Sequence, residues 1–583
     1  FLAALTFAAQ NKGDVNKASR LGQTDYMAQA YSFGEQKKTG LEATGKKGVI
    51  SLGDVSYSAS SASPGQTVGT SYYDYQHNCS MGRMIETGPH SGVTGPAVVH
   101  FSWMYMASAD DLGQARSYAY NAYSTATHQY AGAHILHDDE YSGYVNIDVT
   151  PDNRGIVGGH TDVHGPVKYQ AQMHFDDCST CEDFAAFSRI PDSLAAYDQE
   201  GDLEAMWPKF LFQFGTDTVL HVITHNWDYY GAQMYFRCVG YEGQGVWDYP
   251  PYVVDTNQCM AHDLTGPRVG DKVGLAWLAS PPYQEPWCDT CSGLTVYDGL
   301  LAGQYDNDVY IQISDDQGVT WQPKKNLTQR QIGEPGYRAY CDLSVVFDSD
   351  ENLHVVWNGT PWPADTCIDA GGLCFTEDWW LDPARIFHWS ENMPYVRTVH
   401  DATWLPSDSC GPPHFWSAQV AKMSISECNG RLYCLFTQFN DVPGGVDDDC
   451  AQWGYDQNRW PGPANGDLWM CISADGGMTW DAARNLTNSY TPHCDPLLGE
   501  VCQSDYWASM TRWGRQVQTG EDWSAAEIVD PSGGTSPTDY YLDVQYVNDL
   551  DAGTPIWGDP DAEGSWTNNP IKWFRVPCVE EIR

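Results

Sequence analysis

Two segments of this 583-residue chain repeat one another at the same internal spacing. Residues 314–328 and 473–487 share the pattern Ser-x-Asp-x-Gly-x-Thr-Trp followed by Asn-Leu-Thr, with eight of fifteen positions identical. Each follows a strand-like run, at 308–313 and 467–472. Ser and Asp side chains can bond local backbone groups, Gly accepts a positive φ, and Trp can pack back over a turn. The repeats therefore predict two hairpin turns in a chain built of strands.

This pattern resembles the Asp-box, or BNR, repeat of sialidase-like β-propellers. In that family the box joins the third and fourth strands of a blade, on the rim away from the active-site face. The resemblance covers residues 70–583 in architecture, with strict motif matches only in the boxes at 314–321 and 473–480. It implies a structural role for the motif residues Ser314, Asp316, Gly318, Trp321, Ser473, Asp475, Gly477 and Trp480.

Short apolar or aromatic runs recur about every 55 to 80 residues, with a longer last interval. Seven are found, at 98–103, 155–160, 219–225, 273–278, 353–357, 432–436 and 541–546. Several follow a turn signal, as the second strand of a hairpin would. We predict an all-β, seven-bladed β-propeller, with six or eight blades as alternatives. The apparent blades are 70–125, 126–177, 178–245, 246–335, 336–408, 409–495 and 496–583.

The charge of the chain excludes some partners. There are 31 basic and 76 acidic side chains, so the net charge is −45. A chain this acidic is unsuited to neutralising the phosphates of nucleic acid or to docking on anionic lipid. No stretch approaches the roughly 20 apolar residues that span a bilayer. An apolar content of 42% with 13% aromatics argues against disorder of the whole chain.

The N-terminal region differs from the rest. Residues 1–50 hold seven basic and four acidic groups, a net charge of +3. We predict that residues 1–69 form a basic arm and linker outside the propeller at 70–583. Its apolar tip would dock on a second copy of the acidic body and build an extracellular filament. The tip residues assigned to that assembly are Phe1, Leu2, Leu5 and Phe7.

Cysteine usage suggests an oxidising compartment. There are 18 cysteines, which a cytosolic protein rarely keeps unless it binds metal. Two close pairs, Cys178/Cys181 and Cys288/Cys291, could supply four thiolates to zinc, although 106 residues separate them. We predict disulfides, and hence a secreted or cell-surface protein, with a zinc site and free thiols as the alternatives.

The resemblance also supplies a test for catalysis. Catalytic sialidases carry an early Arg-Ile-Pro motif, two further arginines, a Tyr–Glu nucleophile pair and an Asp acid/base. Three guanidinium groups hold the substrate carboxylate, and the carboxylates transfer protons and the glycosyl group. Arg189 begins an Arg-Ile-Pro sequence, but in the third apparent blade rather than the first. No convincing triad accompanies it, so Arg189 is a weak catalytic candidate and a loop residue is the alternative.

Histidines and acids offer further candidates. His100, His160, His221, His225 and His354 recur on the predicted strands, where a shared packing position explains them. The alternation of His160, Asp162 and His164 could place metal ligands on one strand face. Acidic clusters could bind Ca²⁺ through their oxygens, or could simply be solvated. The weak metal candidates are Asp306, Asp308, Asp447 and Asp449.

We therefore predict a non-catalytic structural or adhesive propeller whose partners are copies of itself or an extracellular protein or glycan. The first alternative is a sialidase-like glycoside hydrolase, which needs three arginines and a Tyr–Glu pair converging on the centre. The second is a soluble glycan-binding module with an exposed aromatic platform. We expect no cofactor beyond Ca²⁺.

Overall fold

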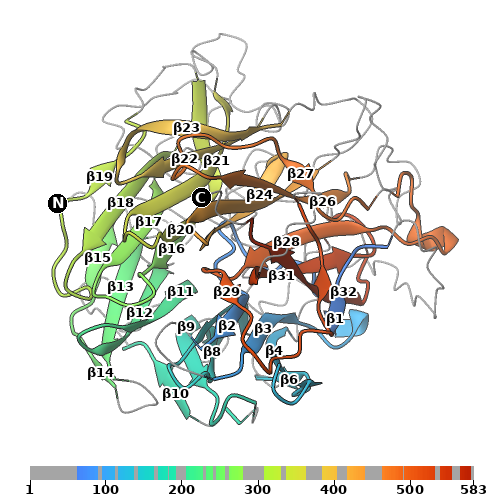
Figure 1. Cartoon of the computed structure of the whole chain (residues 1–583), viewed down its shortest axis with the longest axis horizontal. Helices are drawn as coiled ribbons and strands as arrows, with labels where there is room; N and C mark the ends of the chain where they lie inside the picture. Colours follow the sequence, from blue (N-terminus) through green and yellow to red (C-terminus); the bar gives the residue numbers. More distant parts are fainter. Residues whose placement is uncertain are drawn as a thin grey trace, which may run out of the picture.

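The computed structural model forms a seven-bladed β-propeller, in which seven antiparallel sheets follow one another around a central channel in chain order (Figure 1). Apart from the 3₁₀ turns Ala109–Asp111 and Pro496–Leu498, the described residues contain no helix. Nor does any helix in this part of the chain have the length and hydropathy needed to cross a membrane. The structure describes residues 62–89, 95–111, 116–136, 142–162, 169–180, 183–184, 186–191, 205–226, 232–240, 245–256, 261–279, 307–329, 336–362, 384–402, 417–439, 463–489, 491–531, 539–554 and 565–579.

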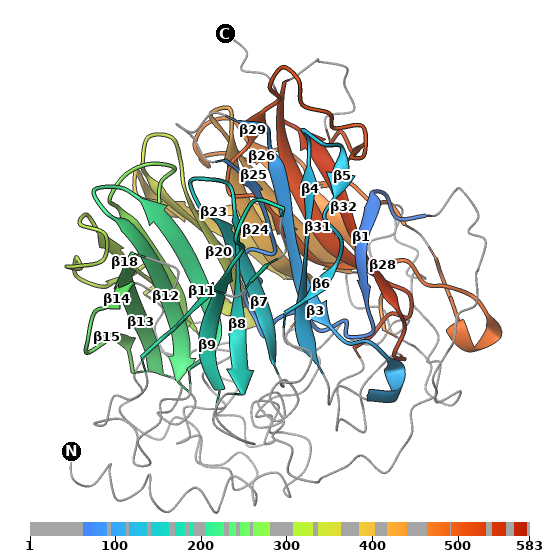
Figure 2. The same ribbon diagram turned by 90° about the horizontal axis from the view of Figure 1, so that it is seen from below.

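Each sheet has four principal strands, described here from the channel outward (Figure 2). The first three sheets are β2 (Ile85–Gly88), β3 (Val98–Tyr105), β4 (Ser117–Ser124), β5 (Gln129–Tyr130); β7 (Ser142–Val149), β8 (Gly155–Asp162), β9 (Tyr169–Phe175), β10 (Ala186–Arg189); and β11 (Ala205–Phe214), β12 (Thr218–Asn226), β13 (Ala232–Val239), β14 (Val246–Trp247). The next three are β16 (His262–Thr265), β17 (Val273–Ala279), β18 (Asp308–Ser314), β19 (Lys325–Asn326); β20 (Gly336–Phe347), β21 (Leu353–Trp362), β22 (Arg385–Ser390), β23 (Met393–Asp401); and β24 (Val420–Cys428), β25 (Arg431–Phe439), β26 (Gly466–Ser473), β27 (Arg484–Asn485). The seventh is β28 (Ser504–Met510), β31 (Tyr540–Asp549), β32 (Asn569–Pro577) and β1 (Gln66–Ser71). Four short strands pair at the sheet edges: β6 (His134–Ile135), β15 (Tyr252–Asp255), β29 (Arg515–Gln516) and β30 (Glu527–Ile528).

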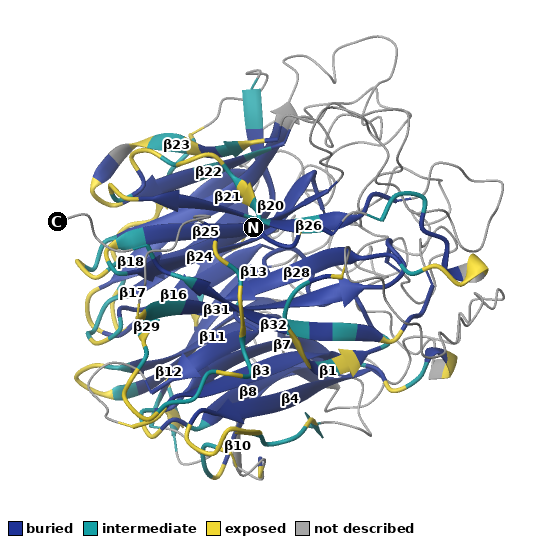
Figure 3. Ribbon diagram, turned by 45° about the vertical axis from the view of Figure 1, so that its right-hand side comes forward, coloured by how far each residue is buried: buried dark blue, intermediate teal, exposed yellow. Residues whose placement is uncertain are grey.

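The seven apolar runs found in the sequence lie on the second strand of each sheet, namely β3, β8, β12, β17, β21, β25 and β31. A second strand is covered on both faces by neighbouring blades, so nearly all of its residues are buried (Figure 3). This burial explains why these strands read as continuous apolar runs. The predicted blade count is confirmed. The predicted limits fit the fifth and sixth blades. The seventh sheet also contains β1, although that blade was predicted to span 496–583, and β10 belongs to the second sheet although the third blade was predicted to start at 178.

The ring is closed by its N-terminal strand. β1 pairs antiparallel with β32, from Gln66 opposite Trp573 to Ser71 opposite Asn569. The predicted boundary between arm and propeller, at 69/70, therefore falls inside a strand of the seventh sheet. A disulfide from Cys428, at the end of β24, to Cys578, after β32, fastens this sheet to the sixth.

The connection from β1 to β2 fills the channel. In this channel segment, residues 72–84, every residue except Tyr72 and Gly82 is buried. It contacts the inner strands of five sheets. The side chain of Arg83 makes several of these contacts. It donates to the carbonyl oxygens of Val345, Ile425 and Met510 and to Ser424 Oγ, at 2.8–3.1 Å. The centre of the propeller is thus a packed polar core.

Candidate functional site: the mouth of the channel

Five inner strands carry a bulge near the end at which they begin. The pairing register of β7, β11, β20, β24 and β28 shifts there against the second strand. In four of them the bulge holds a large residue with positive φ: Tyr144 (56°), Trp207 (48°), Lys422 (54°) and Trp507 (58°). These four are the non-glycine residues with positive φ that lie inside described strands. Such a conformation costs about 1–3 kcal/mol and is retained where side chains must be re-aimed.

We call this end of the channel the mouth, and the other end the far end. Lys422 lies at the mouth, where it is fully buried and pairs with Asp342 at 2.9 Å. Its ammonium group also donates to the carbonyl oxygen of Cys79, at 3.1 Å, and lies 5.0 Å from the Trp507 ring centroid. Burial alone would lower the pKa of Lys422, but Asp342, Tyr506, Cys341 and Cys79 together outweigh burial and raise the pKa above its ordinary value. The mouth therefore holds one permanent buried cation.

A second lysine behaves differently. Lys209 Nζ donates to His77 Nδ1 at 2.9 Å and to the carbonyl oxygen of Met81 at 3.1 Å. Burial lowers the pKa of Lys209 to about 7, with a further contribution from the charge of Lys422. Burial also lowers the pKa of His77 well below its ordinary value. Because His77 Nε2 lies 2.8 Å from the carbonyl oxygen of Val145, we assign the ring proton to Nε2, which leaves Nδ1 to accept from Lys209.

Three more histidines surround the backbone of Trp207. His160 Nδ1 accepts from the Trp207 amide at 3.1 Å, and His262 Nε2 donates to the Trp207 carbonyl oxygen at 2.9 Å. The His225 ring lies 4.9 Å from the Trp207 indole. Burial lowers the pKa of His262 well below its ordinary value, so it is neutral at pH 7. Neutral His77 and His262 and several aromatic rings thus lie at the same end of the channel as the buried cation Lys422, and of these groups Lys209, with a pKa of about 7, can exchange a proton near neutral pH.

The structure places Arg189 away from this set. It is the last residue of β10, the outermost strand of the second sheet, and its guanidinium donates to Gln172 Oε1 at 2.6 and 2.9 Å. Deeper in the channel, Arg512 is bound by Glu86 at 3.1 Å and by Asp148 at 2.6 Å. Arg189 therefore lies on a strand rather than in a loop, and the channel arginines Arg83 and Arg512 are already engaged by the protein.

The two boxes adopt the same turn. In the first, Ser314 Oγ and the Thr320 amide both donate to Asp316 Oδ1, each at 2.8 Å, and the Gly318 amide donates to Ser314 Oγ at 2.8 Å. The second repeats these bonds at 2.8–2.9 Å with Ser473, Asp475, Gly477 and Thr479. Each turn joins the third and fourth strands of its sheet. A third strand ends opposite to where the first begins, so both boxes lie at the far end.

Each box docks on the preceding blade, and this close contact requires a glycine in the box. Gly318 and Gly477 have φ of 80° and 87°. A Cβ on Gly318 would overlap the Tyr235 hydroxyl, and one on Gly477 would overlap the His388 ring. Trp321 and Trp480 pack edge-on to these same two rings, at 4.9 and 5.3 Å. The tryptophans thus reach the neighbouring blade, whereas the sequence suggested packing over their own turn.

The histidines predicted to share a packing position fall into two groups. His100 and His221 each contact a third-strand tyrosine hydroxyl through Nδ1, at 2.7 and 2.6 Å, and His354 contacts His388 in the same way at 3.0 Å. These three repeat one packing site. His160 and His225 instead belong to the mouth, which the sequence pattern did not separate from the repeated site.

Several predicted residues lie outside the described part of the chain. These are Phe1, Leu2, Leu5 and Phe7 of the assembly tip, and Asp306, Asp447 and Asp449 of the metal candidates. Asp308 is described, and its carboxylate accepts from Asn326 at 2.6 Å and from Thr328 at 2.5 Å. No group of three or more His, Cys, Asp or Glu residues suited to a metal occurs within the described ranges.

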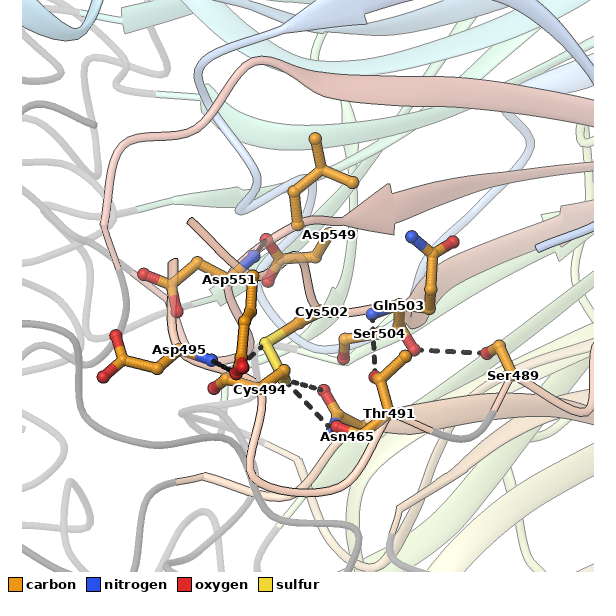
Figure 4. Close-up of a disulfide and its surroundings, with 12 residues drawn as sticks. Asn465, Ser489, Thr491, Cys494, Asp495, Cys502, Gln503, Ser504, Asp549 and Asp551 are labelled. Carbon is orange, nitrogen blue, oxygen red and sulfur yellow. Dashed lines mark hydrogen bonds between the residues drawn. A yellow bond between two sulfur atoms is a disulfide. The ribbon is translucent and has the colours of Figure 1, made fainter. Parts of the chain in front are cut away.

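The cysteines form disulfides, as the sequence predicted. Besides Cys428–Cys578, Cys494 is joined to Cys502 in the loop before β28, where Asn465 Nδ2 approaches Cys494 Sγ (Figure 4). Cys178 is also disulfide-bonded, which removes it from any zinc site. Among the described residues the free thiols are all buried: Cys79, Cys238, Cys341, Cys434 and Cys471.

Comparison with known proteins yields similarity in architecture alone. No family model and no curated protein sequence matches the chain. A polysaccharide lyase of family PL25, an ulvan lyase, is 8% identical over 87% of this chain and 96% of its own, with a TM-score of 0.41. The NanB sialidase of Streptococcus pneumoniae is 10% identical over 64% of this chain and 67% of its own, with a TM-score of 0.35. The propeller domain of the Trilobed protease from Pyrococcus furiosus is 8% identical, covering 83% and 99%, with a TM-score of 0.34. At this level the likeness carries no argument about activity.

Proposed function

We propose that this chain processes an acidic glycan at the mouth of its channel. The observation that carries the proposal is the set of four bulges that hold Tyr144, Trp207, Lys422 and Trp507 at positive φ. Four large residues strained at one end of one channel are expected where function requires their placement. The disulfides support a place of action outside the cytosol.

The residue types match the chemistry of a charged sugar. Aromatic rings can pack against the apolar faces of sugar rings, and the mouth holds those of Trp207 and Trp507, both buried. Its cation, Lys422, is paired with Asp342 and would share its charge with a substrate carboxylate. Lys209, with a pKa of about 7 beside His77, can accept and return a proton near neutral pH.

Proton abstraction accounts for these residues better than hydrolysis does. Glycoside hydrolysis uses two carboxyl groups about 5–9.5 Å apart. Among the described mouth residues Asp342 is committed to Lys422 and also accepts from Asn358 Nδ2 at 3.2 Å. A nitrogen base could instead take the proton beside a uronate carboxylate; its electrons form the new C=C bond, and the glycosidic C–O bond breaks as the leaving oxygen takes a proton.

The test is turnover on a panel of uronate-containing, sulfated, sialylated and neutral polysaccharides, read by reducing ends and by ultraviolet absorbance of unsaturated uronate. We expect Lys209→Met to lower kcat by about 10²–10⁴-fold because a general base is lost. Lys324→Met is the matched control, since Lys324 pairs with Asp255 at 2.7 Å away from the mouth. Inactivity of the wild type across the panel, or full activity of Lys209→Met, would contradict the proposal.

A non-catalytic structural or adhesive role is the second candidate. The filled channel favours it, because carbonyl oxygens of the channel segment already accept from Lys209 and Lys422, and Arg83 of that segment already donates to the inner strands. In that role the two lysines would only anchor the channel segment, and the same panel would show neither turnover nor binding that depends on Lys209.

A further inference from the structure

The segment that enters β1 is held by the seventh sheet through hydrogen bonds. The Ser63 amide and hydroxyl contact Gln503 Oε1 at 3.1 and 3.0 Å. The hydroxyl also lies 2.9 Å from Asp505 Oδ2 and accepts from Asn548 Nδ2 at 2.9 Å. Ser63 and Asp505 are both fully or almost fully buried. Asp505 is thus one of the residues that anchor the segment entering the closing strand β1.

A second carboxyl group faces Asp505 through Ser489. Ser489 Oγ lies 2.8 Å from Asp505 Oδ2 and 2.8 Å from Asp467 Oδ1. It also lies 3.1 Å from the carbonyl oxygen of Gln503, and both of these residues are labelled in Figure 4. Asp467 is the residue that ties the second box to its sheet, since it accepts from Asn485 at 2.6 Å and Thr487 at 2.9 Å.

The two serine hydroxyls at this junction face more acceptor oxygens than they have protons to donate. A hydroxyl group carries one proton, yet Ser489 Oγ faces three acceptor oxygens and Ser63 Oγ faces two. With both carboxyl groups ionised, only two of these five contacts can be hydrogen bonds. A proton on Asp505 adds a third: Asp505 donates to Ser489, Ser489 donates to Asp467, and Ser63 donates to Gln503.

The surroundings of Asp505 agree with this count. Burial raises the pKa of Asp505 to about 7, and the charge of Asp467 adds to the effect. Glu527, which accepts from the Gly65 amide at 2.6 Å, and the buried Tyr546 lie on the same side. Lys572, which donates to the Gly65 carbonyl oxygen at 3.3 Å, is the cation of this group, and burial lowers its pKa.

We propose that Asp505 is a proton-operated latch that holds the ring closed at β1. In the protonated state Asp505 donates to Ser489, which leaves the Ser489 proton for Asp467 and the Ser63 proton for Gln503, so the closing segment, β28 and the turn after β27 are all held by hydrogen bonds. When Asp505 ionises, two adjacent buried carboxylates repel, Ser489 can donate to only one of them, Ser63 can serve Asp505 only by giving up Gln503, and the junction loosens. In the first repeat the residue that corresponds to Asp467 is Asp308, which accepts from Asn326 and Thr328.

The direction of the pH effect follows from the raised pKa of Asp505. Between its unfolded value of about 3.9 and about 7, the folded chain binds a proton that the unfolded chain does not. The stabilising contribution is fully present below the unfolded value and is lost as the pH rises to about 7. Above that pH no further loss comes from this group.

Hydrogen–deuterium exchange of the full chain tests the latch. After correction for intrinsic rates, we expect the peptide covering residues 62–71 to exchange about tenfold faster at pH 8.5 than at pH 5.5. Asp505→Asn keeps a donor toward Ser489 at every pH, so it should abolish this difference. Asp308→Asn is the matched control and should keep it. Equal protection of the wild type at both pH values, or an unchanged pH dependence in Asp505→Asn, would overturn the proposal.

Infrared spectroscopy gives a second readout if Asp505→Asn does not fold. The wild type below pH 7 should show the carbonyl band of a buried protonated carboxyl group, which disappears as the pH rises through 7. Asp467→Asn removes the neighbouring charge and should move that midpoint to lower pH. Absence of the band in the wild type, or a midpoint that Asp467→Asn leaves in place, would overturn the latch without bearing on glycan turnover.

Discussion

The two ends of this propeller use left-handed backbone in different ways. At the far end it occurs in turns, where Gly318 and Gly477 adopt it inside the two boxes and Gln317 (54°) adopts it beside Gly318. At the mouth it occurs within strands, on Trp207, Lys422 and Trp507 among others. Glycine adopts a positive φ at little energetic cost, whereas a bulky residue is strained there. The two ends therefore differ in where their left-handed residues lie. At the far end these residues lie in turns that dock one blade on the next, and at the mouth they lie within strands, where the strain aims side chains.

The two ends also differ in the charge state of their titratable groups: Asp316 at the far end stays ionised, whereas Lys209 and His77 at the mouth move toward their neutral forms. At the far end, bonds from Thr320 and Ser314 outweigh slight burial and lower the pKa of Asp316, which keeps it ionised. At the mouth, burial moves Lys209 and His77 toward their neutral forms. Fixed charges suit a structural turn, and groups that change charge near pH 7 suit chemistry.

The largest effect we expect comes from breaking the buried ion pair of the mouth. Lys422→Met should lower the free energy of unfolding by about 3–5 kcal/mol, because Asp342 is left buried and uncompensated. The pair Lys324–Asp255 is the comparison: Lys324 is 38% exposed, and Asp255, although buried, keeps a bond from Trp277 Nε1 at 2.8 Å, so Lys324→Met should cost only about 1 kcal/mol. Chemical denaturation measures both, and equal costs would show that the two cations do not differ as described.

A smaller effect should separate docking from backbone strain at the far end. Gly318→Ala combines a positive φ with overlap of the Tyr235 hydroxyl, so we expect a loss of about 2 kcal/mol or more in unfolding free energy. Gly430 also has positive φ, at 72°, but a Cβ there meets nothing within 4 Å. Gly430→Ala should therefore cost about 1 kcal/mol. Losses of the same size in both variants would mean that docking on the preceding blade adds nothing.

The sequence predicted the fold well because its strongest signals are structural. Second strands such as β17 and β25 are buried on both faces and read as apolar runs, and the boxes repeat a side-chain pattern that the turn itself requires. Short outer strands such as β10 and the closing strand β1 have no such pattern, so the blade limits near them were misplaced.

The mouth was missed because a bulge breaks the alternation by which strands are read. Its only local trace is a polar residue two positions after the strained one, as in Trp207 with Lys209 or Trp507 with Ser509. That spacing is too common to single out a site. His77 meets Lys209 because the channel segment is threaded through the ring, and Asp342 meets Lys422 because β20 and β24 are inner strands of neighbouring sheets. These contacts join residues 132 and 80 positions apart in the sequence.

The central claim is that a glycan binds at the mouth, and a structure of the chain with an acidic oligosaccharide tests it most directly. Our account predicts density for a charged sugar within hydrogen-bonding reach of Lys209 or Lys422 and in contact with Trp207 or Trp507. Density confined to the outer strands or the far end, or an empty mouth at saturating oligosaccharide, would contradict it.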